Sequence, residues 1–170
     1  MRRAATRPGA SANARRSAGF TLIEVLVTLT LLATLAMIAW PLARIAAQQN
    51  REAELRRALW QIREAIDAHK AAMDGGRLTR MVGASGYPPT LAALVEGVTD
   101  VRNPAGAKLY FLRRIPRDPM CACPGTPDAD TWGLRAYASP PDAPEAGDDV
   151  FDVYSTSVDV GTNGVRYKDW

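Results

Sequence analysis

An unbroken apolar stretch near the N-terminus constrains this chain more than any other feature. From Phe20 to Ala43 there are 24 residues and a single charge, Glu24. A hydrocarbon layer of about 30 Å requires about 20 helical residues at about 1.5 Å of rise each. The run from Leu22 to Leu42 is therefore long enough to cross a membrane as one helix, and Arg44 closes it.

The residues before this stretch are basic. The first 16 positions hold five of the 21 basic residues, and no acidic residue precedes Glu24. Without residues 1–19 the chain has 16 basic and 18 acidic residues, so its basic character belongs to the leader and gives no reason to expect a nucleic acid as partner. Positive charge before a membrane helix places the N-terminus in the cytoplasm and the remainder outside. The five arginines are Arg2, Arg3, Arg7, Arg15 and Arg16.

Two simpler explanations of the apolar stretch fit less well. A secretory signal peptide has an apolar core of about 7 to 15 residues and an A-x-A-like cleavage site. This stretch is longer, and no A-x-A occurs between Leu31 and Asn50. A plain membrane anchor gives no reason for Glu24, although a charge in a membrane helix costs about 2.5 to 3.5 kcal/mol at mid-bilayer and less near the interface. Glu24 is therefore a candidate functional residue.

The helical pattern continues beyond the apolar stretch. Apolar residues recur at helical spacing between charged ones, and Asp74-Gly75-Gly76 supplies a stop signal. We expect one helix over residues 20–73, with a bend at Pro41 and one apolar stripe along its second half. The residues of the stripe are Leu55, Leu59, Ile62, Ile66 and Met73.

The C-terminal part is rich in glycine and proline. Eleven of the 13 glycines and 10 of the 12 prolines lie between Gly75 and Gly164, which excludes long helices there. A short helix is predicted from Leu91 to just before Gly97. Strands are predicted over Lys108–Ile115, Leu134–Ser139 and Val150–Ser155, and the turns between them favour antiparallel pairing. The fold class is therefore α+β, with the apolar stripe of the long helix covering a small antiparallel sheet.

A short motif stands at the mouth of the apolar helix. It reads Gly19-Phe20-Thr21-Leu22-Ile23-Glu24, preceded by the basic leader. These residues resemble the signature of type IV prepilins, a superfamily that often carries proline where Pro41 stands. The resemblance implies that a prepilin peptidase cuts between Gly19 and Phe20 and methylates the new amine of Phe20. Glycine at the cut also leaves the backbone open to a peptidase.

Later segments narrow the resemblance to the major pseudopilins of type II secretion systems. Tyr87–Leu91, Phe111–Pro119 and the ending from Phe151 to Trp170 are similar to stretches of that family. In the family Asp-Pro is followed at once by Trp-Gly, so here Met120–Thr131 resembles an insertion. The resemblance implies a pilin-like fold and a structural subunit, not an enzyme. It implies as partners further copies of the chain, other pseudopilins, the prepilin peptidase and the inner-membrane assembly platform.

This resemblance also implies an organisation of the chain. Residues 1–19 are a leader removed on maturation, residues 20–73 are the long helix with about 20–43 in the inner membrane, and residues 74–170 form a small periplasmic domain. A short periplasmic filament then forms from many copies. A type IV pilus subunit or minor pilin is the alternative within the superfamily. A membrane-anchored periplasmic binding module is the alternative from another class.

Glu24 has a specific role under this reading. It lies four residues, or about 6 Å along a helix, beyond the amine of Phe20. The amine of an incoming subunit can pair with Glu24 of a subunit already assembled, which relieves the cost of both charges in a low-dielectric setting and fixes the axial register.

The terminal loop is a candidate calcium site, because related major pseudopilins bind calcium there. Asp159 matches the family position and Asp169 is the second candidate ligand, whereas Lys168 stands where relatives tend to have carboxylates. Calcium takes six to eight oxygens. The EF-hand pattern fails, since Gly161 replaces a ligand and Trp170 ends the loop. A solvated acidic turn is the alternative.

Two cysteines and one histidine complete the candidates. Cys121 and Cys123 are expected to face an oxidising compartment, where a disulfide within the chain or between chains can form. A zinc site would need more ligands nearby. His69 flanks the apolar stripe, and we expect it to pack against the sheet, not to act as a base.

Overall fold

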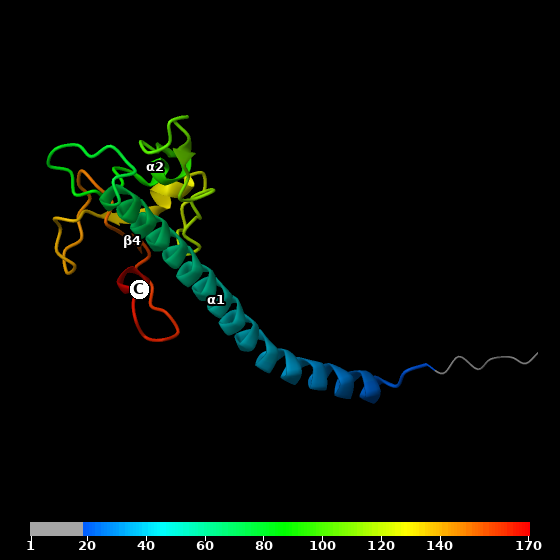
Figure 1. Cartoon of the computed structure of the whole chain (residues 1–170). Coiled ribbons are helices and arrows are strands. Elements are labelled where there is room, and N and C mark those ends of the chain that lie inside the picture. Colours follow the sequence, from blue (N-terminus) through cyan, green and yellow to red (C-terminus); the bar gives the residue numbers. More distant parts are fainter. Residues whose placement is uncertain (1–18) are drawn as a thin grey trace, which may run out of the picture. The chain divides into compact units, whose positions relative to one another are not determined.

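The structure is a computed structural model that describes residues 19–170, apart from the side chain at position 38. The basic leader, expected over residues 1–19, therefore lies outside the described residues except for Gly19. Helix α1 runs from Leu22 to Asp74, so the expected long helix is confirmed to within two residues (Figure 1). It begins after Thr21, whose hydroxyl accepts the backbone N–H of Glu24 at 3.3 Å.

Helix α1 ends where two glycines were expected to stop it. Gly76 has a φ of 65°, a conformation that glycine adopts without steric cost. The backbone N–H of Arg77 donates to the carbonyl of Ala72 at 3.0 Å, which satisfies one of the last carbonyls of the helix.

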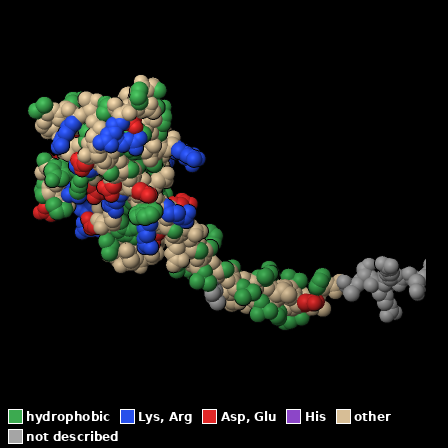
Figure 2. Space-filling view, viewed as in Figure 1, with side chains coloured by type: hydrophobic (Ala, Val, Ile, Leu, Met, Phe, Trp, Pro, Cys, Tyr) green, Lys and Arg blue, Asp and Glu red, His purple; other side chains and the backbone are tan. Residues whose placement is uncertain are grey.

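The chain divides into two compact units, the first ending at Ala43 and the second beginning at Arg44. In the first unit every side chain described from Gly19 to Ala43 is exposed, including Leu22 at 78% and Leu35 at 64%. Figure 2 shows hydrophobic side chains along the face of this segment that is in view. Hydroxyls in this unit bond to carbonyls of their own helix, for example Thr30 Oγ1 to Leu26 O at 2.7 Å. An apolar helix whose threonine hydroxyls bond to its own carbonyls suits a lipid environment. It is long and apolar enough to cross a membrane.

The second unit builds its core on the predicted stripe. Leu55, Leu59, Ile62 and Ile66 are all at most 3% exposed, while Met73 is only partly buried. The small domain supplies the facing side chains, because its strands and loops present one apolar side to the helix. These residues are Leu91, Leu94, Leu112, Trp132, Val150, Val153 and Tyr167.

The small domain is α+β with antiparallel pairing, as expected, but it holds two two-stranded sheets in place of one. Strand β1 (Val98–Thr99) pairs with β2 (Lys108–Leu109), and β3 (Trp132–Arg135) pairs with β4 (Asp152–Ser155). The other elements are α2 (Leu91–Glu96) and the 3-10 helices η1 (Asp128–Thr131) and η2 (Tyr167–Asp169). Helix α2 confirms the predicted short helix, with Thr90 accepting the N–H of Ala93.

The extents predicted for the strands were wrong. The first was expected over Lys108–Ile115 but ends at Leu109, because the N–H groups of Phe111 and Leu112 both donate to the carbonyl of Leu94 in α2, at 3.1 and 2.9 Å. Backbone donors used in this way cannot form a ladder.

The last two strands also differ in extent from the predicted ranges. Strand β3 begins at Trp132, before the predicted start at Leu134, and ends at Arg135. The N–H of Ala136 leaves the ladder to donate to Glu145 across a loop, at 2.8 Å. Strand β4 begins at Asp152 and ends at Ser155 as predicted, while Val150 donates to the carbonyl of Pro88 at 2.8 Å and stays outside it.

Candidate functional site

The N-terminal motif leads directly into the first turn of α1. Glu24 is the acidic residue of that turn, where a negative charge interacts favourably with the helix dipole. Phe20 precedes the helix and is 80% exposed, and among the described residues no atom beyond Gly19 and its chain neighbours lies within 4 Å of the position that a Cβ on Gly19 would take. Gly19 and Phe20 are both exposed in the part of the chain that the structure describes. Exposed leucines surround this motif on the following turns.

Comparison with protein families gives one match. Residues 14–40 match the model of the prokaryotic N-terminal methylation motif. The motif indicates a type IV pilin-like protein. Such proteins are structural, not enzymatic, and the motif implies processing by a prepilin peptidase and assembly with other pilins. The apolar first half of α1 is compatible with the membrane anchoring of a pilin-like protein.

The rest of the chain has no such counterpart. No curated protein and no solved structure matches it. The methylation match ends at Trp40 and does not include the C-terminal domain. Its α+β architecture, a long helix with small antiparallel sheets, is consistent with a pilin-like fold.

The C-terminal loop is held to α1 by one buried carboxylate, that of Glu52. Glu52 is 3% exposed and accepts four hydrogen bonds. Thr162 donates its backbone N–H at 2.7 Å and its hydroxyl at 2.5 Å, Tyr167 donates its hydroxyl at 3.0 Å, and Gln48 donates its amide at 3.1 Å. The loop around Thr162 therefore lies against the helix, as its red trace beside α1 shows (Figure 1).

The electrostatics of this cluster favour an ionised Glu52. Burial by itself raises the pKa of a carboxyl group, but the hydrogen bonds from Thr162, Tyr167 and Gln48 outweigh it and hold the pKa of Glu52 below 4.5. Burial raises the pKa of the neighbouring Tyr167 hydroxyl, which therefore stays protonated and donates. The cluster is a charged acceptor fully surrounded by donors.

The two candidate calcium ligands have different surroundings in this structure. The backbone carbonyl of Asp159 accepts the N–H of Tyr167 at 3.1 Å, and Asp169 lines an open groove with Trp60 and Trp170. Among residues 19–170, no three His, Cys, Asp or Glu side chains lie close enough to share a metal ion. The carboxylate that organises the loop is Glu52, which belongs to the helix. Calcium coordination by Asp159 and Asp169 stays a prediction without support from this arrangement.

The C-terminal residue is also tied to α1. Arg63 donates to the main-chain oxygen of Trp170 at 2.9 Å and to the carboxylate of Asp152 at 2.8 Å. The guanidinium of Arg56 lies 4.5 Å from the centre of the Trp170 ring, a cation–π geometry. Two arginines of the helix thus hold the chain end and strand β4 in place.

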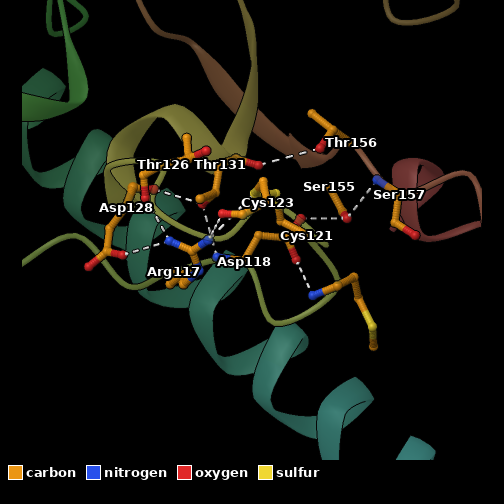
Figure 3. Close-up of a disulfide and its surroundings, with 11 residues drawn as sticks. Arg117, Asp118, Cys121, Cys123, Thr126, Asp128, Thr131, Ser155, Thr156 and Ser157 are labelled. Atoms are coloured by element: carbon orange, nitrogen blue, oxygen red, sulfur yellow. Dashed lines mark hydrogen bonds and ion pairs between the residues drawn. A yellow bond between two sulfur atoms is a disulfide. The ribbon is translucent and has the colours of Figure 1, made fainter.

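The structure joins Cys121 and Cys123 in a disulfide, with the two Cα atoms 5.3 Å apart (Figure 3). They lie between Pro119 and η1, in the segment that the resemblance marks as an insertion. Figure 3 shows the guanidinium of Arg117 beside Cys123. Of the pairings left open by the sequence, the structure has the one within the chain.

His69 is buried inside the domain, at 2% exposure, and its ring meets the edge of Phe111 with centroids 5.2 Å apart. Phe111 lies two residues after the end of β2, so this ring contact is made with the segment that follows the strand. Burial lowers the pKa of His69 from 6.5, although the backbone of Gly86 partly opposes this. Among residues 19–170 its Nδ1 has no hydrogen-bond partner, which suits a neutral ring.

Sequence reasoning missed Glu52. It lies three residues before Leu55, so it occupies a position of the buried stripe, where a carboxylate needs partners. The position of Glu52 could have predicted its role, because a carboxylate on an apolar helical face needs hydrogen-bond donors from the segment that packs on that face. The partners, Thr162 and Tyr167, are more than 100 residues away in sequence.

Proposed function

We propose that this chain is a pseudopilin, a membrane-inserted subunit that a type II secretion system stacks into a short periplasmic filament. One observation carries the proposal. A methylation motif leads into a helix whose first half is apolar on every side, while the second half of the same helix holds a small folded domain. A free helix of this kind exposes its leucines to water, so it must be covered by lipid or by other helices.

The proposed mechanism is assembly. Cleavage between Gly19 and Phe20 leaves a charged amine at the membrane face, and Glu24 lies about one helical turn deeper. In lipid Glu24 lacks a countercharge, and an incoming subunit offers one. Pairing of the amine with Glu24 of the neighbouring copy lowers the cost of both charges and sets the stagger between parallel helices. The exposed leucines then cover one another in the filament core.

The membrane topology is part of the proposal. The basic leader keeps the N-terminus in the cytoplasm, and residues from Arg44 onward are periplasmic. In this proposal residues 1–19 are the leader, residues 20–73 are the long helix and residues 74–170 are the domain. About residues 20–43 lie in the inner membrane. The domain's partners are then other copies, other pseudopilins and the assembly platform.

The resemblance in the domain favours a pseudopilin over a type IV pilus subunit. The residues of the segment that ends in Asp118-Pro119 make specific contacts in this fold. Asp118 is 1% exposed and accepts the hydroxyl of Ser155 at 2.6 Å, and the indole of Trp132 donates to Pro116 at 2.8 Å. These contacts join the segment to β3 and β4, which explains why the motif residues occur together.

A deletion strain distinguishes the readings. Loss of this chain should stop export of the secretion system's substrates and leave surface pili intact, and complementation should restore export. Loss of pili with normal secretion would replace the pseudopilin by a pilus subunit. If the deletion strain keeps both export and pili, and the leader is not cleaved, the membrane-anchored binding module would be favoured.

A further inference from the structure

The disulfide between Cys121 and Cys123 is poorly suited to stabilising the fold. A disulfide stabilises a protein mainly by closing a loop in the unfolded chain, and the effect grows with the length of that loop. Here the two cysteines are separated by one residue, Ala122. The ring is so short that closing it removes little conformational freedom.

The surrounding loop is held by other contacts, which do not involve sulfur. Asp118 accepts the N–H of Met120 at 2.8 Å, and its own N–H donates to the hydroxyl of Thr131 at 3.1 Å. Arg117 donates to the carbonyl of Thr126 at 2.7 Å and to the carbonyl of Cys123. These bonds, drawn in Figure 3, remain available when the disulfide opens, so the loop can keep its shape in both redox states.

The two sulfur atoms have different surroundings. The guanidinium Nη2 of Arg117 lies 3.6 Å from the Sγ of Cys123. Asp128 is the acidic side chain that meets this guanidinium, at 3.5 Å from Nη1, and the buried carboxylate of Asp118 is engaged by Ser155 and Met120. A cation beside a thiol favours the thiolate and lowers the thiol pKa. A thiol of lower pKa is the better leaving group in disulfide exchange.

The site is also within reach of a small reagent. Cys121 and Cys123 are each half-buried, and Ala122 between them is exposed. An incoming thiolate therefore meets the disulfide at the surface of the domain.

We propose that Cys121 and Cys123 form a thiol–disulfide exchange site that accepts electrons from an external dithiol. A thiolate of the dithiol attacks the Sγ of Cys121, the sulfur–sulfur bond breaks, and its electron pair goes to Cys123, which leaves as a thiolate beside Arg117. The second thiol of the donor attacks the mixed disulfide and releases Cys121. Two electrons pass and the donor becomes a disulfide. The two protons that the donor thiols lose are taken up by Cys121 and Cys123, which become a dithiol. This proposal does not depend on the secretion function.

The test uses the full mature chain in detergent. The variants C121S and C123S each leave one thiol, and the rate of alkylation by iodoacetamide is measured against pH. Cys123 should titrate below the ordinary value of about 8.5, and at least about one pH unit below Cys121. Adding Arg117→Gln to C121S should raise the pKa of Cys123 toward that ordinary value. Arg113→Gln, at an exposed arginine four residues earlier, is the matched control and should leave it unchanged.

The intact disulfide gives a second measurement. Dithiothreitol should open it more slowly in Arg117→Gln than in the unsubstituted chain. Equal pKa values for the two thiols, or a higher value for Cys123, would overturn the proposal. If Arg117→Gln does not fold, the comparison of C121S with C123S decides alone, since both retain the arginine.

Discussion

The two halves of helix α1 share one backbone conformation and have opposite surfaces. Before Ala43 the side chains are apolar on all sides, and every one that is described is exposed. After Arg44 apolar side chains form a single stripe, and Leu55 and Ile62 on it are completely buried. The comparison shows that the first half needs an external apolar environment, whereas the second half is completed by its own domain. Substitutions in the two halves should therefore fail in different assays.

The largest effect is expected at Glu24. Glu24→Ala should leave membrane insertion intact, because a costly charge is removed. Assembly should fail, because the amine of the incoming subunit enters the filament unpaired, which costs about 3 to 5 kcal/mol for a buried ion pair that loses one partner. Filament formation and substrate export are the measurements. Glu54→Ala, at an exposed glutamate in the second half of the helix, is the control and should assemble normally.

Substitution of an apolar residue should destabilise the domain when the residue lies in the second half of α1 and not when it lies in the first half. Ile62→Ala should destabilise the domain by about 2 to 5 kcal/mol, because it leaves a cavity in a fully buried site. Leu29→Ala, at a leucine that is 57% exposed in the first half, should leave the unfolding of the domain unchanged. Denaturant unfolding of the detergent-solubilised chain measures both. Similar losses in the two variants would show that the halves do not fold independently.

Glu52 should matter less than the core but more than any exposed acidic residue. Glu52→Gln removes the charge that four donors surround, and a loss of about 1 to 3 kcal/mol is expected. The thermal unfolding midpoint is the measurement, with Glu54→Gln as control. An unchanged midpoint would mean that the C-terminal loop is held by something other than this carboxylate.

Acid should weaken the domain through His69. The pKa of this ring is lowered by burial, so the unfolded chain binds the proton more readily. The contribution of the neutral His69 ring to the free energy of unfolding is fully present above its ordinary pKa of 6.5. It is lost as pH falls through the lower pKa of the folded state. Glu52 and Asp100, whose pKa values are also lowered, titrate below 4.5 and do not contribute in this range.

The measurement is the free energy of unfolding between about pH 7.5 and pH 5.5. His69→Leu replaces the chain's single histidine and should flatten this dependence. A pH dependence that persists in the variant would assign it to other groups.

Calcium should not change the stability of the domain. The loop that contains Asp159 is already anchored by Glu52, so millimolar calcium is expected to leave the unfolding midpoint unchanged. Binding to the folded state alone would add about 2.7 kcal/mol at a 100-fold excess over the dissociation constant. A rise of the midpoint that Asp159→Ala abolishes would establish the calcium site and contradict this expectation.

The long helix was predictable because its signals are local. Length, apolar content, the spacing of Leu55 to Ile66 and the glycines after Asp74 all act within a few turns, and they gave α1 to within two residues. Strand extents were not predictable, since they depend on where backbone donors go in three dimensions. The carbonyl of Leu94 takes two donors from the predicted first strand, and no local pattern encodes that choice.

The candidate site divides in the same way. The motif around Glu24 is contiguous, and the family match falls on it. The anchor of the terminal loop is made by Glu52 and Thr162, which are 110 positions apart, so the sequence offered only an acidic residue on an apolar stripe. The calcium prediction rests on residues of the loop alone and stays a prediction, and it did not include Glu52 of the helix on which the loop packs.

Mass spectrometry of the mature N-terminus tests the central claim most directly. The chain is isolated from membranes of cells that contain an active prepilin peptidase. We predict that it begins at Phe20 with a methylated amine, because the basic leader, Gly19 and Glu24 together form the processing motif that residues 14–40 match. A chain that still begins at Met1 in those membranes would contradict the pilin-like assembly mechanism.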